Sequence, residues 1–446
     1  MKTSIHPFLA SLAAGMMLTL TVAAQSISKE INFNAEDSLS LEAIIKQVVA
    51  THPTILKAAE AVQIADAGVG MAKTGKLPDI DFTAGYTRLG PLSSITIPDM
   101  GTFQMGVADN FNTSLNVRQS IYDFSKTDKS IKLQESSKEM ATQAVELVKQ
   151  RLSLATALNY YSLVYLQEAL KIKNQQIETL KEHLNFVNKK METGSALKYD
   201  VLSTQVRLSA AENQKVDIVT AYRNSLSSLN SLLGLPVETI LKVKKSTPAS
   251  YAAEPAQQMI EYAVANRPEM TLANLKQENA KLSLASTKVQ SAPSLSAFTT
   301  GGFKNGYIPE SQKIKANYTA GLTLKVPIFT ANRQKYNEAI AVSNISVAQQ
   351  EQIQAQRDIS AEVFQNDANL QSAKQKIEQS KKQVQQAEES RKLAELSYQT
   401  GSLTNLDLLD ATTLEAESRL NLLKAQAEFA TDLIKLELSL GKTLYE

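Results

Sequence analysis

The sequence Y-Q-T-G-S-L-T-N-L-D-L-L-D occupies residues 398–410 and separates two long runs of helical periodicity, 332–397 and 406–440. Gly401 has no Cβ and can adopt the left-handed conformation that ends a helix. Ser402 and Asn405 are residue types that cap a helix N-terminus, so either is expected to start the second helix. The stretch is therefore predicted to form the tip of a long helical hairpin.

The run before this tip has the composition of a coiled coil. Apolar residues recur every seven positions with alanines interleaved, in the set Val363, Leu370, Ala373, Ile377, Val384, Ala387 and Ala394. Most other positions are Gln, Glu, Lys, Asn, Ser or Ala. This pattern predicts a narrow packed seam with the remaining helix faces in water.

The composition argues against an enzyme and against a cofactor or metal site. The 446 residues include no cysteine and three histidines, and the net charge is +2. Disulfides and thiolate metal sites are excluded, and the near-neutral charge does not indicate a nucleic-acid partner. His52 and His183 lack a matched carboxylate or hydroxyl partner, and no glycine-rich phosphate loop follows a predicted strand.

Residues 1–24 are predicted to be a secretory signal peptide. Lys2 supplies a positive charge, Leu9–Leu20 an apolar segment and Val22-Ala23-Ala24 a cleavage site of small residues. A membrane anchor is the alternative, but the apolar segment is short for a spanning helix, which needs about 20 residues. No other stretch approaches that length, so a crossing of a bilayer by the mature chain would require strands.

The rest of the chain contains one pattern twice, which predicts an internal duplication. His52-Pro53 corresponds to Arg267-Pro268, and Thr193-Gly194-Ser195 corresponds to Thr400-Gly401-Ser402. The first repeat, 25–255, is expected to contain helices 38–73, a strand hairpin 79–121, a long helical hairpin 125–233 and an equatorial segment 234–255. The second repeat, 256–446, is expected to contain helices 257–289, a strand hairpin 294–328 and a long helical hairpin 331–440.

Alternation of apolar and polar residues marks the predicted strands, four in the chain, with residues 90–110 expected to be a polar loop. Four strands cannot close a barrel, because membrane barrels need at least about eight. In a membrane, several chains would therefore have to share one barrel. The residues then expected to face lipid are Ile80, Phe82, Tyr86, Leu115, Val117, Leu322 and Leu324. The alternative is a small soluble sheet with one face on a core.

Together these features resemble the TolC-like outer membrane efflux proteins, also called outer membrane factors. The resemblance covers Leu39–Leu444, and its strongest motifs are S-L-S-L-E-A-I-I-K-Q-V-V-A-T-H-P at 38–53, V-P-I-F at 326–329 and the tip motif at 398–411. It implies a mainly α fold with a membrane β-barrel. Three chains would share twelve strands, four from each, and a long α-helical coiled-coil barrel would continue the β-barrel into the periplasm.

The resemblance also implies a function. Such a protein is the outer membrane exit duct of a tripartite efflux or type I secretion system, and it conducts substrate passively. The implied partners are two further copies of the chain, a periplasmic adaptor (membrane fusion) protein, an inner-membrane pump and outer membrane lipid. From the residues alone, a soluble periplasmic helical rod with a structural or adaptor role is the alternative. The cargo, whether drug, metal or protein, is left open.

A periplasmic gate near the hairpin tips is a further implication of the resemblance. Tyr398 corresponds to a gate tyrosine and Asp200 to the carboxylate that accepts its hydrogen bond. Asp407 and Asp410 correspond to two aspartates that ring the constriction. For both aspartates the alternative is stabilisation of a helix N-terminal turn through the helix dipole.

The tips themselves are expected to contact the adaptor, through Gly194, Ser195, Leu197, Gly401, Ser402 and Leu403. Leu403 stands where the best-known family member has an arginine, and Tyr199 stands where the partner of that arginine lies. A second gate link is therefore expected to be absent. The apolar tip residues could instead hold each hairpin closed.

Overall fold

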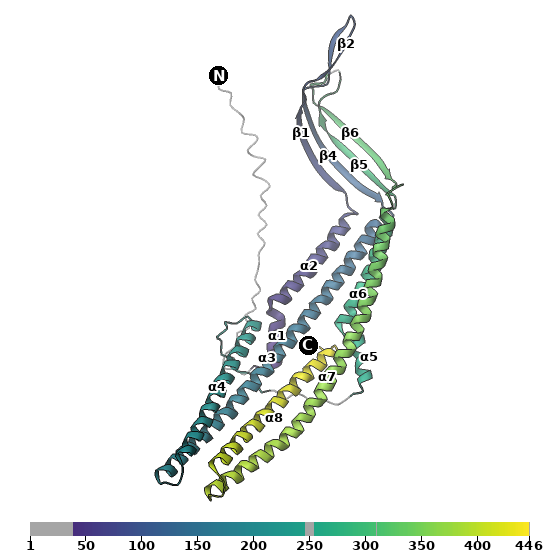
Figure 1. Ribbon diagram of the computed structural model, residues 1–446. Coiled ribbons are helices and arrows are strands. Elements are labelled where there is room, and N and C mark those ends of the chain that lie inside the picture. Colours follow the sequence, from purple (N-terminus) through teal and green to yellow (C-terminus); the bar gives the residue numbers. More distant parts are fainter. Residues whose placement is uncertain (1–38, 246–253, 309, 446) are drawn as a thin grey trace, which may run out of the picture. The chain divides into compact units, whose positions relative to one another are not determined.

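The computed structural model in Figure 1 describes residues 39–245, 254–308 and 310–445. The predicted signal peptide 1–24, the helix start predicted at Ser38 and residues 246–253 of the predicted equatorial segment lie outside the described residues.

Helices make up most of the described chain, and their order in the first half recurs in the second. They are α1 (Leu41–Thr51), α2 (Pro53–Thr74), α3 (Lys126–Glu192), α4 (Lys198–Leu233), α5 (Ala256–Asn266), α6 (Pro268–Val289), α7 (Arg333–Gln399) and α8 (Asn405–Ser439). Helices α3 and α7 have 67 residues each. At 1.5 Å per residue, each is about 100 Å long. The division into two repeats that ends at residue 255 stays an interpretation of the sequence.

Proline explains why the short helices stop where they do. His52 and Arg267 each precede a proline, which disfavours the helical conformation in the residue before it. Both residues are extended, with φ/ψ of −68°/127° and −73°/134°. Each therefore ends one helix and starts the next, which separates α1 from α2 and α5 from α6.

Four strands form one antiparallel sheet in the order β1-β4-β5-β6, shown in Figure 1 beyond the ends of α2, α3, α6 and α7. The strands are β1 (Asp79–Arg88), β4 (Asp109–Tyr122), β5 (Ser294–Lys304) and β6 (Lys315–Lys325). Pairing of β4 with β5 joins the two hairpins, and the register shifts between Ser120 and Tyr122. Within the described chain, β1 and β6 are the edges of this sheet.

The prediction of a loop over residues 90–110 is wrong. This segment contains β2 (Ser93–Ile97) and β3 (Gly101–Met105), which pair as a separate two-stranded sheet. Ile95 lies opposite Phe103, and Thr96 lies opposite Thr102. The period-two pattern of these short strands is hidden by the Gly, Pro, Ser and Asp residues around them.

The register of β1 and β4 places like residues opposite one another. Phe82 pairs with Leu115, whereas Thr83 pairs with Ser114, and the two hydroxyl oxygens of the second pair are 2.7 Å apart. Successive side chains of a strand point to opposite faces, so one face is apolar and the other polar. Exposed fractions of 68% for Phe82 and 70% for Leu322 show that the apolar face is uncovered in the single chain.

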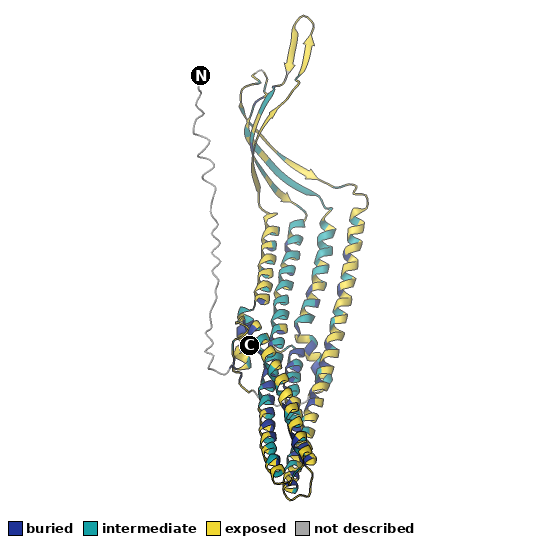
Figure 2. Cartoon of the chain, turned by 60° about the vertical axis from the view of Figure 1, so that its left-hand side comes forward, coloured by how far each residue is buried: buried dark blue, intermediate teal, exposed yellow. Residues whose placement is uncertain are grey.

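The coiled-coil seam predicted in α7 is buried at most of its positions. Val363, Leu370, Ala373, Ala387 and Ala394 are buried, and Ile377 and Val384 are half-buried. Near its centre, α7 contributes to a core with α5 and α8 made of Met259, Ala263, Ile359, Val363, Leu370, Leu433, Leu436 and Leu440. Figure 2 shows buried residues gathered on the helices, while the edge strands β1 and β6 are largely exposed and β5 is mostly of intermediate exposure.

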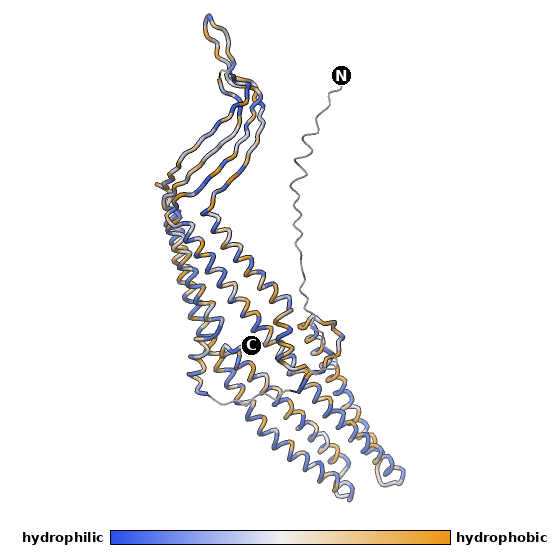
Figure 3. The backbone as a smooth tube through the Cα atoms, turned by 180° about the vertical axis from the view of Figure 1, so that it is seen from behind, coloured by the Kyte–Doolittle hydropathy of each residue, from blue (hydrophilic) through white to orange (hydrophobic). Residues whose placement is uncertain are grey.

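Figure 3 shows hydrophilic and hydrophobic residues interspersed along the helices. Among the described helices, none combines the length and the apolar character that crossing a membrane requires.

Candidate functional site

The two hairpin tips are built by the same backbone turn. Gly194 and Gly401 both have the left-handed conformation, with φ of 73° and 78°. The backbone N–H of Ser195 donates to the carbonyl of Lys190 at 2.7 Å, and that of Ser402 donates to the carbonyl of Ser397 at 2.8 Å. These 6→1 bonds close the end of each long helix. At the tips, Leu197 is 70% exposed and Leu403 is 37% exposed.

Apolar contacts hold the two helical hairpins together just behind the tips. Leu409 of α8 lies in a buried cluster with Ile177, Leu180 and Ala211 of α3 and α4. A second cluster, within the α7–α8 hairpin, contains Ala394, Tyr398, Leu408 and Ala411.

Asn405 is a buried polar junction between the hairpins. It is the first residue of α8, is 4% exposed, and reaches both helices of the other hairpin. Its Nδ2 donates toward the backbone oxygen of Asp200 at 3.1 Å and the hydroxyls of Ser203 and Thr204 at 3.2 Å. Its Oδ1 lies 2.7 Å from Nε2 of His183 on α3.

This arrangement fixes the proton on His183. The backbone oxygen of Asp200 can only accept, so the amide nitrogen of Asn405 must face α4 and its oxygen must face the imidazole. Nε2 of His183 must then donate. Neutral His183 therefore carries its proton on Nε2. Burial lowers the pKa of His183, while the bond to Asn405 and the charges of Glu395 and Asp200 act in the opposite direction.

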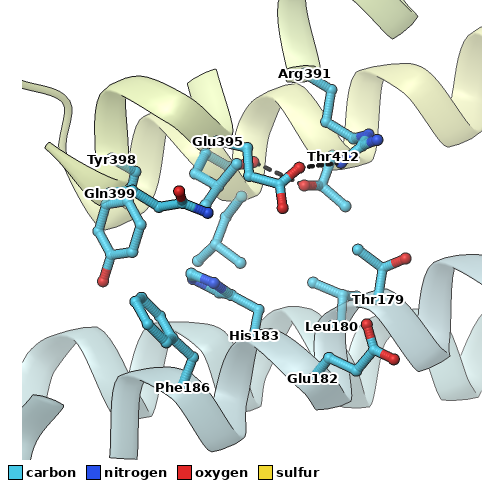
Figure 4. A pocket seen from close by; sticks show the side chains of 12 residues that line it. Thr179, Leu180, Glu182, His183, Phe186, Arg391, Glu395, Tyr398, Gln399 and Thr412 are labelled. Carbon is cyan, nitrogen blue, oxygen red and sulfur yellow. Dashed lines mark hydrogen bonds and ion pairs between the residues drawn. The ribbon is translucent and has the colours of Figure 1, made fainter. Parts of the chain in front are cut away.

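Tyr398 lies in an aromatic group with His183, as Figure 4 shows. Its ring centroid is 5.3 Å from that of His183 and 6.2 Å from that of Phe186. Nζ of Lys190 lies 4.6 Å from the Tyr398 centroid and 5.0 Å from the Phe186 centroid, in range of cation–π attraction. Burial is the main cause that raises the pKa of Tyr398, and the charge of Asp200 adds to it.

The predicted hydrogen bond from Tyr398 to Asp200 is not formed in the described chain. The carboxylate of Asp200 instead accepts from the backbone N–H of Leu197 at 3.0 Å, as expected in the first turn of α4. The resemblance to the family predicted a hydrogen bond between the side chains of Tyr398 and Asp200, but the Asp200 carboxylate instead stabilises the N-terminus of its own helix, α4. Whether these residues act in a gate stays a prediction.

Asp407 is part of a helix cap, as the alternative for this residue proposed. Its carboxylate accepts from the backbone N–H of Thr404 at 3.0 Å and from the Thr404 hydroxyl at 2.6 Å, which lowers its pKa. Thr404 is the N-cap of α8, so the expectation that Ser402 or Asn405 would cap it is wrong. Three capping residue types occur within four positions, and the backbone geometry selects Thr404 among them.

Asp410 forms an ion pair that crosses between the hairpins. Its Oδ1 lies 2.5 Å from a guanidinium nitrogen of Arg207 on α4. The side chains are 58% and 39% exposed. The carboxylate of Asp410 is therefore paired with a cation in this chain. Neither the predicted place in a ring at the constriction nor the alternative role in a helix N-terminal turn includes this contact.

Sequence reasoning also missed a charged cluster on the adjacent turns. The Glu415 side chain, 11% exposed, pairs with Arg391 of α7 and, at 2.8 Å, with Arg419. Arg419 also contacts Glu388 at 2.8 Å and donates to Gln175 of α3 at 3.1 Å. The four-residue spacing of Glu415 and Arg419 was visible in the sequence, whereas their partners on other helices were not.

A pocket of about 200 Å³ opens beside His183 and Tyr398, between α3 and the α7–α8 hairpin (Figure 4). Its lining includes His183, Phe186, Tyr398, Glu395 and Arg391. Within the described chain, no group of three or more His, Asp and Glu side chains could hold a metal ion. The pocket lies between two packed hairpins, and its volume is that of about seven water molecules.

Comparison with known proteins finds relatives that are outer membrane or secretion proteins. The outer membrane protein TolC of Vibrio cholerae is 22% identical over 408 residues, which are 90% of both chains. The alkaline protease secretion protein AprF of Pseudomonas aeruginosa is 22% identical over 346 residues, 75% of this chain and 70% of the relative. Among solved structures, the Campylobacter jejuni CmeC outer membrane channel has a TM-score of 0.78 at 16% identity, with 90% of this chain and 85% of that chain covered.

The fold resemblance confirms the predicted class of a mainly helical chain with a strand region. The sequence also matches the family described as outer membrane efflux protein over residues 44–235 and 259–442. Both matched segments carry one strand hairpin and one long helical hairpin, so the match includes the sheet and both tips. The chain therefore belongs to the outer membrane efflux protein family.

Proposed function

We propose that this outer membrane channel protein is the exit duct of a tripartite efflux or type I secretion system. It would conduct substrate passively from an inner-membrane pump and a periplasmic adaptor to the cell exterior. Family membership supports this proposal. So do relatives named for alkaline protease secretion and pyoverdine export, the second 26% identical over 307 residues in Pseudomonas putida.

The observation that carries the proposal is the unfinished sheet. One chain supplies four strands whose edges, β1 and β6, have no partner within the described residues. An open edge in hydrocarbon would leave backbone groups without hydrogen bonds, which costs several kcal/mol per group. Pairing β6 of one chain with β1 of the next removes every edge. Three chains then give twelve strands, enough for a lumen that side chains do not fill.

The exposed apolar face disfavours the alternative of a soluble periplasmic rod. Ile80, Phe82, Leu115 and Leu322 are 60%, 68%, 49% and 70% exposed, and all lie on one sheet. A contiguous apolar face of this kind marks a membrane or protein interaction surface. In the proposed trimer it would face lipid, and the polar residues on the opposite face would line the lumen.

At the periplasmic end we place the gate near Tyr398, Asp200, Asp407 and Asp410. The contacts of the single chain support a closed arrangement, because Asn405 and the pair Arg207–Asp410 bind one hairpin to the other. The adaptor would dock on the tips beyond these contacts, at Gly194, Ser195, Leu197, Gly401, Ser402 and Leu403. The exposure of Leu197 supports this placement.

Two measurements test the proposal. Native mass spectrometry of the detergent-extracted protein should give three chains, and planar bilayers should show conducting channels. Recovery of the protein as a soluble periplasmic monomer would contradict it and favour the rod. A stable membrane dimer would contradict the twelve-stranded barrel while leaving the location intact.

A further inference from the structure

His183 occupies a position from which it can control the closure of the tip. It lies on α3, three residues before Phe186, and its one hydrogen bond to the described chain reaches Asn405 at the start of α8. Asn405 in turn binds Asp200, Ser203 and Thr204 of α4. The imidazole thus belongs to a chain of contacts that joins α3, α8 and α4. Separation of the hairpins at this level must break it.

The charged groups around His183 come from three helices. On α3 these are Glu182 and Lys190, on α4 Asp200, and on α7 Arg391 and Glu395, with the titratable Tyr398 beside them. Helix α8 contributes neutral residues to the pocket, namely Leu408, Leu409 and Thr412, and the amide of Asn405. Glu395 is held by Arg391 at 2.8 Å, so part of its charge is already compensated.

Neutral and protonated imidazole fit this site differently. The neutral ring donates from Nε2 to Asn405, and its Nδ1 carries an uncharged lone pair that forms no hydrogen bond with the described residues. The protonated ring adds an N–H at Nδ1, which forms no hydrogen bond with the described residues in the closed arrangement, and it brings a positive charge close to Lys190. In the closed arrangement, the charged imidazolium would also lie beside the rings of Tyr398 and Phe186 and the side chain of Leu180, which solvate a charge less well than water does.

The sign of the pH effect follows from this comparison. The pKa of His183 is lowered in the closed arrangement, mainly by burial, relative to about 6.5 for an exposed histidine. Protonation therefore favours the arrangement in which the ring reaches water. The stability that the closed contact provides is complete above about pH 6.5 and is lost as the pH falls below that value.

We propose that His183 is an acid-sensitive latch between the two helical hairpins, closed when the imidazole is neutral and released when it is protonated. The latch itself is a property of the single chain. Its consequence for conduction rests on the proposed function, in which separation of the hairpins opens the periplasmic end of the duct.

The absence of cysteine allows a direct test on the full-length protein in detergent. Spin labels are attached after Ser195→Cys and Ser402→Cys, one label at each tip, and the distances between them are measured at pH 7.5 and pH 5.5. We expect the distances to lengthen and broaden at pH 5.5. His183→Gln, whose amide can donate to Asn405 but does not titrate, should show the same distances at both values.

His52→Gln is the matched control, because His52 is the other histidine among the described residues and lies at the start of α2, away from the tips. This variant should keep the full pH response. An unchanged response in His183→Gln, or no response in the parent protein, overturns the proposal.

A second measurement covers the case in which His183→Gln misfolds. Nuclear magnetic resonance of histidine-labelled protein, with His52→Gln used for assignment, should give His183 a pKa below that of an exposed histidine. A value at or above it overturns the latch. Bilayer recordings then separate the two proposals: acid-induced separation of the tips without any conductance would retain the latch and reject the duct.

Discussion

The two hairpin tips share a backbone and differ in side chains. Both turns use Thr-Gly-Ser with a left-handed glycine, and both following helices have an aspartate, Asp200 or Asp407, that accepts from the backbone at its start. At the residue before the helix, however, Leu197 has no side-chain acceptor, whereas Thr404 caps α8. At the next position, Lys198 is exposed and Asn405 is buried. The two tips therefore share the same backbone turn, but only the second tip has the buried polar junction, Asn405.

The largest difference in stability between the two tips is expected at Asn405. Asn405→Leu would leave the Nε2–H of His183 without its acceptor and would remove the amide donor from the carbonyl of Asp200 and the hydroxyl of Thr204, which keep their bond to each other at 2.7 Å. Leaving buried polar groups unsatisfied costs about 2 kcal/mol. Hydrogen exchange in the first turn of α8 should therefore be strongly accelerated.

Lys198→Leu is the matched control in the other tip, because Lys198 occupies the corresponding place and is exposed. It should change local stability by less than about 0.5 kcal/mol. Equal effects of the two substitutions would show that the tips are energetically equivalent despite their different contacts.

The cap should give the next largest difference. Thr404→Ala removes the hydroxyl that accepts from the backbone N–H of Asp407 at 3.3 Å. Loss of an N-cap costs about 1 kcal/mol. Exchange of the first amides of α8 should rise accordingly, whereas Leu197→Ala should leave α4 exchange almost unchanged because Leu197 provides no such bond. A comparable change in both helices would mean that the turn, not the cap, sets their stability.

A smaller effect is expected for the ion pair between the hairpins. Asp410 corresponds in the duplication to Ser203, so the second tip supplies the anion and Arg207 of the first supplies the cation. Because both side chains are partly exposed, solvent screening limits their coupling to about 0.5 kcal/mol. A double-mutant cycle with Arg207→Ala and Asp410→Ala should show this coupling and its decrease at high salt. A coupling that does not depend on salt would indicate that another chain of the proposed trimer buries the pair.

The smallest change is expected for Tyr398→Phe. The substitution keeps the ring that contacts His183 and Lys190 and removes a hydroxyl that forms no bond with Asp200 in the described chain. Tip stability should change by less than about 0.5 kcal/mol, and the resting conductance in planar bilayers should stay close to that of the parent. A large rise in conductance would reveal a hydroxyl contact that forms only between chains.

The sequence predicted those features that depend on local pattern. The helical period, the glycines at 194 and 401 and the prolines at 53 and 268 are sufficient to locate the long helices and their breaks, because each acts on its own backbone. The short strands β2 and β3 were not predicted, because turn-forming residues surround them and hide their alternating pattern.

The contacts at the tips could not be predicted in the same way. His183 and Asn405 are 222 residues apart, and Arg207 and Asp410 are 203 apart. Which side chains meet depends on the rotation of α8 against α3 and α4. That rotation is set by packing at residues such as Leu409 and Ala211, which have the same apolar character as many others in these helices.

The pairing of β4 with β5 has a consequence for the order in which the chain folds. Asn116 lies opposite Thr300, so this seam closes a segment that includes all of α3 and α4. The hairpins β1–β4 and β5–β6 join strands separated by much shorter segments and can form early. The entropy of closing a long loop delays the seam until the intervening helices have shortened the path between its ends. Until this seam closes, β4 and β5 are open edges in addition to β1 and β6, so the separate hairpins can pair with strands of another chain before the four-stranded sheet is complete.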